Sequence, residues 1–204
     1  CMLHRNMPDV LRSSRIIGRI RTPAGPRGAA PPPAGVPAML QSPLRFVHFI
    51  DNESVPAEGG ESLPVVDPSN GAVFAQIARG GAADIDRAVR AARAAFEGPW
   101  GRLSAVERGR LLRRWGDAVE AHADELAQLE SQDTGKPLRQ ARADALALAR
   151  YFEFYAGAAD KLHGQTIPYQ DGYTVLTIRE PHGVTGHIVP WNYPMQIIGR
   201  SVGA

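Results

Sequence analysis

The stretch GHIVPWNYP, Gly186 to Pro194, places an amide side chain between two prolines. Pro190 and Pro194 restrict the residues before them to extended conformations, and Pro194 is tolerated in the first turn of a following helix. The apolar run over 183–190 predicts a buried strand, so we expect Asn192 at or near the N-cap of a helix that begins there. A strand that leads into a helix N-terminus is where α/β proteins bind ligands.

Two roles for Asn192 fit this turn equally well on physical grounds. A side-chain amide held in a stiff turn donates a hydrogen bond in a fixed direction, as an oxyanion hole requires. Alternatively, Asn192 only caps the helix, since asparagine is among the best N-cap residues. The residue types alone leave both roles open.

Other motifs that carry chemistry do not occur. The sequence has no G-x-G-x-x-G, H-E-x-x-H or G-x-S-x-G, and Gly135-Lys136 is followed by proline without the upstream glycine of a phosphate loop. The six histidines show no ligand spacing, so no metal site is expected. The only cysteine, Cys1, excludes a disulfide framework and suits a reducing cytosol.

The charge is divided unevenly along the chain. Residues 1–45 carry seven arginines against one acid, Asp9, and are rich in proline, glycine and alanine, which predicts a disordered tail. Its arginine excess is typical of an organelle transit peptide, and the simpler interpretation is an upstream extension without a role. The remaining residues carry a net charge of −4, which argues against a nucleic-acid surface. No apolar run reaches the roughly 18 residues that span a membrane, and we expect a cytoplasmic protein.

Residues 46–165 read as short strands followed by helices. The runs FVHFI, SLPVVDP and AVFAQIA, separated by the turn signals DNES and DPSNG, predict a small antiparallel meander. An apolar stripe from Ile85 to Phe96 predicts a helix, and Ser104-x-x-Glu107 is a capping box that opens the next one. A long helix from Leu138 carries one apolar stripe, which indicates core packing. Its members are Ala141, Ala145, Leu148, Phe152, Tyr155 and Ala159.

These stretches resemble, in order, the N-terminal region of the NAD(P)-dependent aldehyde dehydrogenases. The resemblance covers about residues 46–204 and includes IVPWNYP, ELAQLESQDTGKPL and YFEFYAGAADKLHGQTIP. It implies an α/β fold in which residues 46–165 begin the cofactor-binding domain and 166–181 form a hairpin that joins subunits. Residues 182–204 would start the dinucleotide-binding sheet. The alternating pattern of 173–180 and a sheet edge left unpaired fit the subunit-joining role independently.

The resemblance also implies roles for single residues. Asn192 would be the amide that stabilises the oxyanion formed from an aldehyde substrate. Ile188, Val189, Pro190 and Trp191, together with Asn192, would line the site of NAD or NADP. A homo-oligomer is expected for the full-length form.

The sequence departs from the family in what it lacks. The family reaction needs a nucleophilic cysteine and a general-base glutamate, and the only cysteine here is Cys1. We therefore expect an N-terminal fragment that is inactive alone and leaves part of its helical apolar surface exposed. The alternative is a non-catalytic module that assembles with full-length subunits through 166–181. A third hypothesis, that residues 1–45 anchor to anionic partners, rests on the tail alone.

Overall fold

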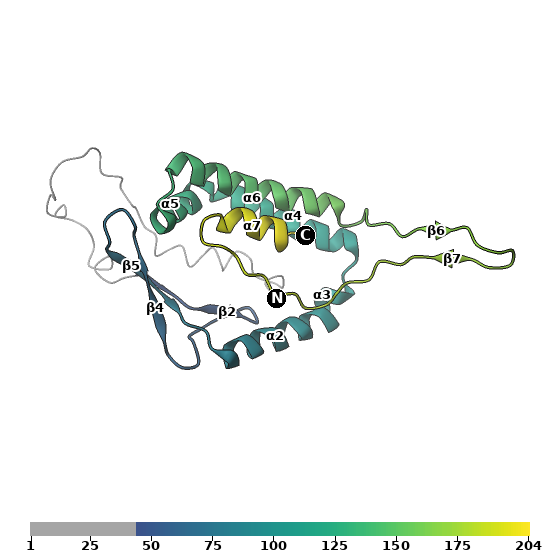
Figure 1. Ribbon diagram of the computed structural model, residues 1–204, viewed down its shortest axis with the longest axis horizontal. Coiled ribbons are helices and arrows are strands. Elements are labelled where there is room, and N and C mark those ends of the chain that lie inside the picture. Colours follow the sequence, from purple (N-terminus) through teal and green to yellow (C-terminus); the bar gives the residue numbers. More distant parts are fainter. Residues whose placement is uncertain (1–43) are drawn as a thin grey trace.

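The structure is a computed structural model that describes residues 44–204, so the predicted tail, residues 1–45, lies outside it except for its last two positions. Those two positions belong to a strand, Leu44–Phe46, so the predicted end of the tail at residue 45 is wrong. Strands come first, then helices, a hairpin and a final helix (Figure 1). The predicted mixed α/β class is confirmed. The domain boundaries at 165, 181 and 182 stay predictions.

The first five strands form two small sheets rather than the single antiparallel meander expected. One sheet has the order β1-β5-β4, and the other is a hairpin of β2 and β3. Their bounds are β1 Leu44–Phe46, β2 His48–Ile50, β3 Glu53–Val55, β4 Ser62–Val66 and β5 Val73–Ala78. The run FVHFI is divided at Val47, and β1 pairs with β5 in parallel, with Leu44 opposite Ala75. The antiparallel pairing of β2 with β3 and of β4 with β5 agrees with the predicted meander. The single sheet is wrong because the pairing of β1 with β5 joins residues distant in sequence, which no local turn signal specifies.

Both predicted turns are confirmed. Asp51 and Asn52 join β2 to β3 and have φ angles of 54° and 64°, the left-handed pair that a two-residue hairpin loop needs. Asp67 closes the turn before β5, because its Oδ1 accepts a hydrogen bond from the Ser69 amide at 2.8 Å.

Helices α4 and α7 begin at the start signals that the sequence gives, the capping box and Pro194. Their bounds are α2 Ala82–Glu97, α3 Pro99–Arg102, α4 Ala105–Ala121, α5 Ala123–Thr134, α6 Leu138–Ala158 and α7 Pro194–Ser201. The capping box of α4 is confirmed: the Glu107 amide donates to Ser104 Oγ at 3.3 Å, and the Ser104 amide donates to Glu107 Oε2 at 2.8 Å. Helix α5 ends at Gly135, which adopts the left-handed conformation that glycine tolerates best.

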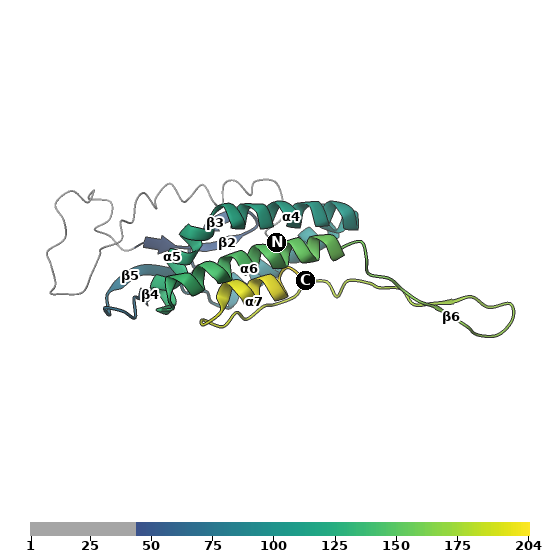
Figure 2. The ribbon, with the colours of Figure 1, turned by 90° about the horizontal axis from the view of Figure 1, so that it is seen from above.

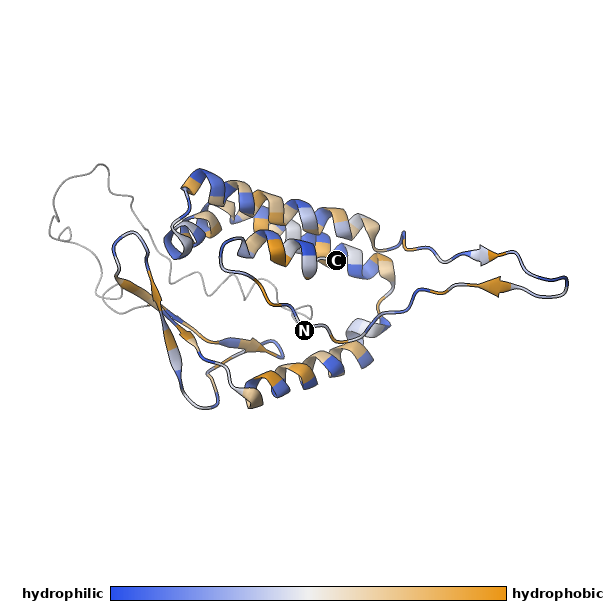
Figure 3. Ribbon diagram, viewed as in Figure 1, coloured by the Kyte–Doolittle hydropathy of each residue, from blue (hydrophilic) through white to orange (hydrophobic). Residues whose placement is uncertain are grey.

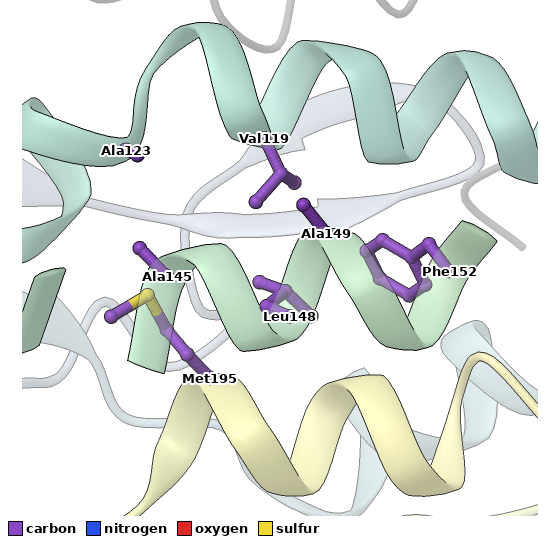
Figure 4. Close-up of a cluster of buried hydrophobic side chains, with 7 residues drawn as sticks. All are labelled: Val119, Ala123, Ala145, Leu148, Ala149, Phe152 and Met195. Carbon is purple, nitrogen blue, oxygen red and sulfur yellow. The ribbon is translucent and has the colours of Figure 1, made fainter. Parts of the chain in front are cut away.

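Helix α6 lies at the centre of the core, between α4 and α5 on one side and α7 on the other (Figure 4). Its predicted stripe is confirmed over Ala141, Ala145, Leu148 and Phe152, which are buried. Tyr155 is half-buried, and Ala159 follows the last helical residue. Trp115 of α4 stacks on Phe152 with ring centroids 4.2 Å apart. Met195 brings α7 into the same cluster, so the last helix docks on α6 through apolar contacts.

The predicted apolar stripe of α2 forms a helix but does not enter this core. Ile85 is 63% exposed and Val89 is also exposed, and Figure 3 shows apolar residues along the length of the helix. Helix α2 contacts α3 and β2. Exposed apolar surface was expected among these helices, and α2 carries it.

The predicted hairpin is present, and Figures 1 and 2 show it projecting away from the helices. Strands β6 (Thr166–Ile167) and β7 (Val175–Leu176) pair antiparallel, and the Thr177 amide donates to the Gln165 carbonyl at 2.9 Å. The chain then returns along α2, where Arg93 lies beside Gly183. None of the helices described from residue 44 onward is long and apolar enough to cross a membrane.

Candidate functional site

The turn around Asn192 joins the returning chain to α7. Pro194 occupies the first helical turn, as expected, but the N-cap residue is Tyr193 and no side chain makes the cap hydrogen bond. The interpretation of Asn192 as the helix cap is therefore wrong for this structure. Asn192 lies one residue before the cap and is exposed, which leaves its amide able to donate to a ligand.

The segment before the turn is extended but is not a strand. Residues 183–190 pair with no strand in the part of the chain that the structure describes, so the predicted buried strand is wrong here. A parallel strand is stabilised by neighbours on both sides and by layers on both faces, and this segment has neither. Ile188 is 99% exposed and Trp191 is 76% exposed, while Val189 is half-buried and Pro190 exposed. Ile188 and Trp191 therefore expose apolar side chains in this segment, and Asn192 exposes an amide next to Trp191.

A buried ion cluster lies directly behind the turn. The Nζ of Lys136 lies 2.7 Å from Asp144 Oδ2, also donates to Glu130 Oε1, and sits 4.4 Å from the ring centroid of Tyr193. Asp144 is fully buried in α6, and Glu130 of α5 is nearly so. The lysine comes from the connection between α5 and α6, so three elements converge on one ammonium group.

Asp144 links this ion cluster to α7. Its Oδ1 accepts hydrogen bonds from Gln196 Nε2 at 2.6 Å and from Gln140 Nε2 at 3.0 Å. Burial alone would raise the pKa of Asp144, but the bonds from Lys136, Gln196 and Gln140 outweigh burial and hold that pKa below its ordinary value. For Glu130 burial dominates and raises the pKa above its ordinary value. Burial would lower the pKa of Lys136, but its two carboxylate partners raise it, so the lysine is charged at neutral pH.

The sequence patterns do not predict this cluster. Gly135-Lys136 resembles a phosphate loop only in part, and that comparison does not point to buried carboxylates. The available signal was Asp144, a charged residue on the apolar stripe of α6 between Ala141 and Leu148. A carboxylate on a core face needs a buried cationic partner, and Lys136 is the nearest lysine along the chain. Among residues 44–204, no cluster of three His, Cys, Asp or Glu side chains is arranged to hold a metal ion.

The chain belongs to the aldehyde dehydrogenase family. The model of that family matches residues 55–204, which include the turn, the hairpin and the ion cluster. Among curated proteins, the mitochondrial aldehyde dehydrogenase family 2 member B4 of Arabidopsis thaliana is 49% identical over 157 residues, covering 76% of this chain and 29% of that protein. The resemblance inferred from the sequence is confirmed.

Solved structures agree with this assignment. A Burkholderia cenocepacia protein described as an aldehyde dehydrogenase is 70% identical, with a TM-score of 0.76 over 77% of this chain and 33% of that one. An NAD+ complex of the Bacillus cereus aldehyde dehydrogenase is 40% identical, with a TM-score of 0.76 over 80% of this chain and 33% of that one. The chain thus spans about a third of the length of the relatives that it matches.

Proposed function

We propose that this chain supplies the oxyanion-stabilising turn and one wall of the cofactor site of an NAD(P)-dependent aldehyde dehydrogenase. The observation that carries the proposal is the exposed Asn192 amide, which precedes α7 and is not used as its cap. Aldehyde oxidation passes through a tetrahedral adduct whose oxygen carries negative charge. A preorganised amide donor stabilises that oxygen, and the positive end of the α7 dipole lies on the same side.

The exposed apolar side chains of Ile188 and Trp191 suit a flat, partly apolar ligand such as a nicotinamide ring. Ile188 and Trp191 present apolar side chains to solvent with no competing contact from the core. The cofactor, NAD or NADP, supplies the hydride acceptor when bound. Residues 188–191 would hold its nicotinamide half beside the Asn192 amide and keep water away from that face.

The test uses a chimera in which residues 46–204 of this chain replace the matching residues of the Burkholderia cenocepacia relative. We expect it to reduce NAD+ or NADP+ with an aldehyde, as read from absorbance at the nicotinamide band. Asn192→Ala should lower kcat by about 10²–10³. Asn192→Asp keeps the shape, loses the donor and should be at least as slow. A chimera whose kcat is unchanged by both substitutions would rule out the role of Asn192.

A second function, subunit assembly through the hairpin, is favoured by its surface. Apolar side chains are exposed on both strands and around the tip, namely Ile167, Tyr169, Tyr173, Leu176 and Ile178. Tyr169 and Tyr173 pack edge to face with centroids 5.8 Å apart, which orders the tip. A projecting two-stranded ribbon is barely stable alone and gains stability when another chain covers its apolar face and edges.

A further inference from the structure

We propose that Lys136 is a positioning residue for the Trp191-Asn192-Tyr193 turn, because its ammonium group joins the buried carboxylates behind the turn to Tyr193 and, through Asp144, to Gln196. This inference depends on the function proposed above only for the catalytic use of the Asn192 amide. The contacts that hold the turn in place do not depend on that function.

The contacts to α7 flank the point where the helix begins. Lys136 Nζ faces the ring of Tyr193, the N-cap residue, at 4.4 Å. Gln196, in the first turn of α7, donates to Asp144 at 2.6 Å. Asn192 is the residue immediately before the cap. The contacts of Tyr193 and Gln196 therefore both lie within four residues of the Asn192 amide.

The location of the cluster argues for a positioning role rather than for stability alone. Removing two carboxylates and an ammonium from water is unfavourable, and buried ion groups are often replaced by apolar residues without loss of stability. In some proteins buried polar groups specify register, because only one arrangement satisfies their hydrogen bonds. Apolar contacts from Met195 fasten α7 to α6, but apolar packing tolerates small shifts that directed hydrogen bonds do not.

Gln140 and Gln196 provide a matched pair. Both donate from Nε2 to the same oxygen, Asp144 Oδ1, but Gln140 belongs to α6 and Gln196 to α7. Losing either bond removes one amide donor from the same carboxylate oxygen, and losing the Gln196 side chain also removes the acceptor of a bond from Arg200 at 2.8 Å. Only the loss of the Gln196 bond removes a link to the turn.

Hydrogen exchange of the 204-residue chain, followed by mass spectrometry, tests the proposal. We expect Lys136→Met and Gln196→Leu to speed exchange in residues 193–203 by about tenfold or more relative to α4 and α6. Gln140→Leu should leave that ratio unchanged. If Lys136→Met does not fold, Gln196→Leu against Gln140→Leu decides alone.

The proposal is overturned if residues 193–203 exchange without protection in the unsubstituted chain. It is also overturned if Gln196→Leu and Gln140→Leu give the same ratio, or if exchange rises equally in α4, α6 and α7. The measurement needs neither cofactor nor aldehyde. A failure here leaves the role of Asn192 to be decided by the chimera, and a failure of the chimera does not affect this result.

Discussion

Gly109 of α4 lies against the main chain of α6: a β-carbon at position 109 would be 2.6 Å from the carbonyl oxygen of Ala156. The two helices can approach this closely because the glycine has no side chain. The α4–α6 contact holds Trp115 on Phe152, so the geometry at Gly109 sets how tightly the core closes.

Gly109→Ala should therefore destabilise the chain by about 1–3 kcal/mol, because the added methyl forces the helices apart. Urea unfolding followed by circular dichroism gives the free energy of unfolding. The matched control is Gly157→Ala in α6, where nothing lies within 4 Å of an added β-carbon. That control should be neutral or should gain about 0.5–1 kcal/mol from helix propensity. Equal losses in both variants would contradict the close packing.

The pKa of the Asp84 carboxyl should lie below its ordinary value. The amides of Gly81 and Glu58 donate to it at 2.9 and 3.0 Å, and these bonds lower its pKa despite burial. The lowered pKa means that the unfolded chain binds the proton more readily. The stability contributed by Asp84 is thus present above its unfolded pKa and is lost as the pH falls through its folded pKa. Carbon-detected NMR measures the folded pKa directly.

Asp84→Asn provides the control for this pH dependence. The variant cannot titrate at position 84, so its stability should fall less steeply than that of the unsubstituted chain as the pH is lowered below about 4. Parallel stability curves for the two proteins would show that Asp84 does not contribute.

Assembly through the hairpin should depend on its exposed apolar residues. Leu176 and Ile178 are largely exposed, at 57% and 78%, so Leu176→Asp with Ile178→Asp places charges where a partner chain would pack. Light scattering should show a mass above that of one chain for the unsubstituted protein and a single-chain mass for the variant. Gln170→Asp, at the exposed tip, is the control and should leave the mass unchanged. A single-chain mass for the unsubstituted protein at tens of micromolar would contradict self-assembly.

The 204 residues by themselves should not oxidise aldehydes. The reaction that the family resemblance implies needs a thiolate nucleophile, and the single cysteine, Cys1, lies far in sequence from the turn. NAD+ or NADP+ with a panel of aldehydes should give no reduced cofactor above a Cys1→Ser control. Turnover that disappears in that control would contradict the prediction.

What the sequence predicts and what it does not can be followed in particular residues. Ser104-x-x-Glu107 and the α6 stripe were predicted correctly because hydrogen bonds and apolar spacing within a few residues determine them. The stripe of α2 predicted the helix but not the exposure of Ile85, because burial depends on what packs against a face. The pairing of β1 with β5 joins distant residues, and local signals do not specify it.

At the candidate site too, features set by neighbouring residues were predicted, and contacts between distant residues were not. The proline at the first position of α7 was predicted from its type alone, and the resemblance singled out Asn192. The cluster of Lys136, Glu130 and Asp144 depends on three elements meeting in space. Sequence reasoning could have found one member, Asp144, but not that Tyr193 and Gln196 would lie against it.

The distance along the chain between Asp144 and Gln196 bears on the order in which the molecule assembles. Helices α4, α5 and α6 follow one another with short connections, so each can pack on its neighbour in the chain before the segment beyond α6 is in place. The bond from Gln196 to Asp144 closes a loop of 52 residues that contains the hairpin. Closing a loop lowers the conformational entropy of the chain, and this loss precedes the favourable contacts that the closed loop makes. We therefore expect the turn that carries Asn192 to dock last during folding and to be released first on partial unfolding.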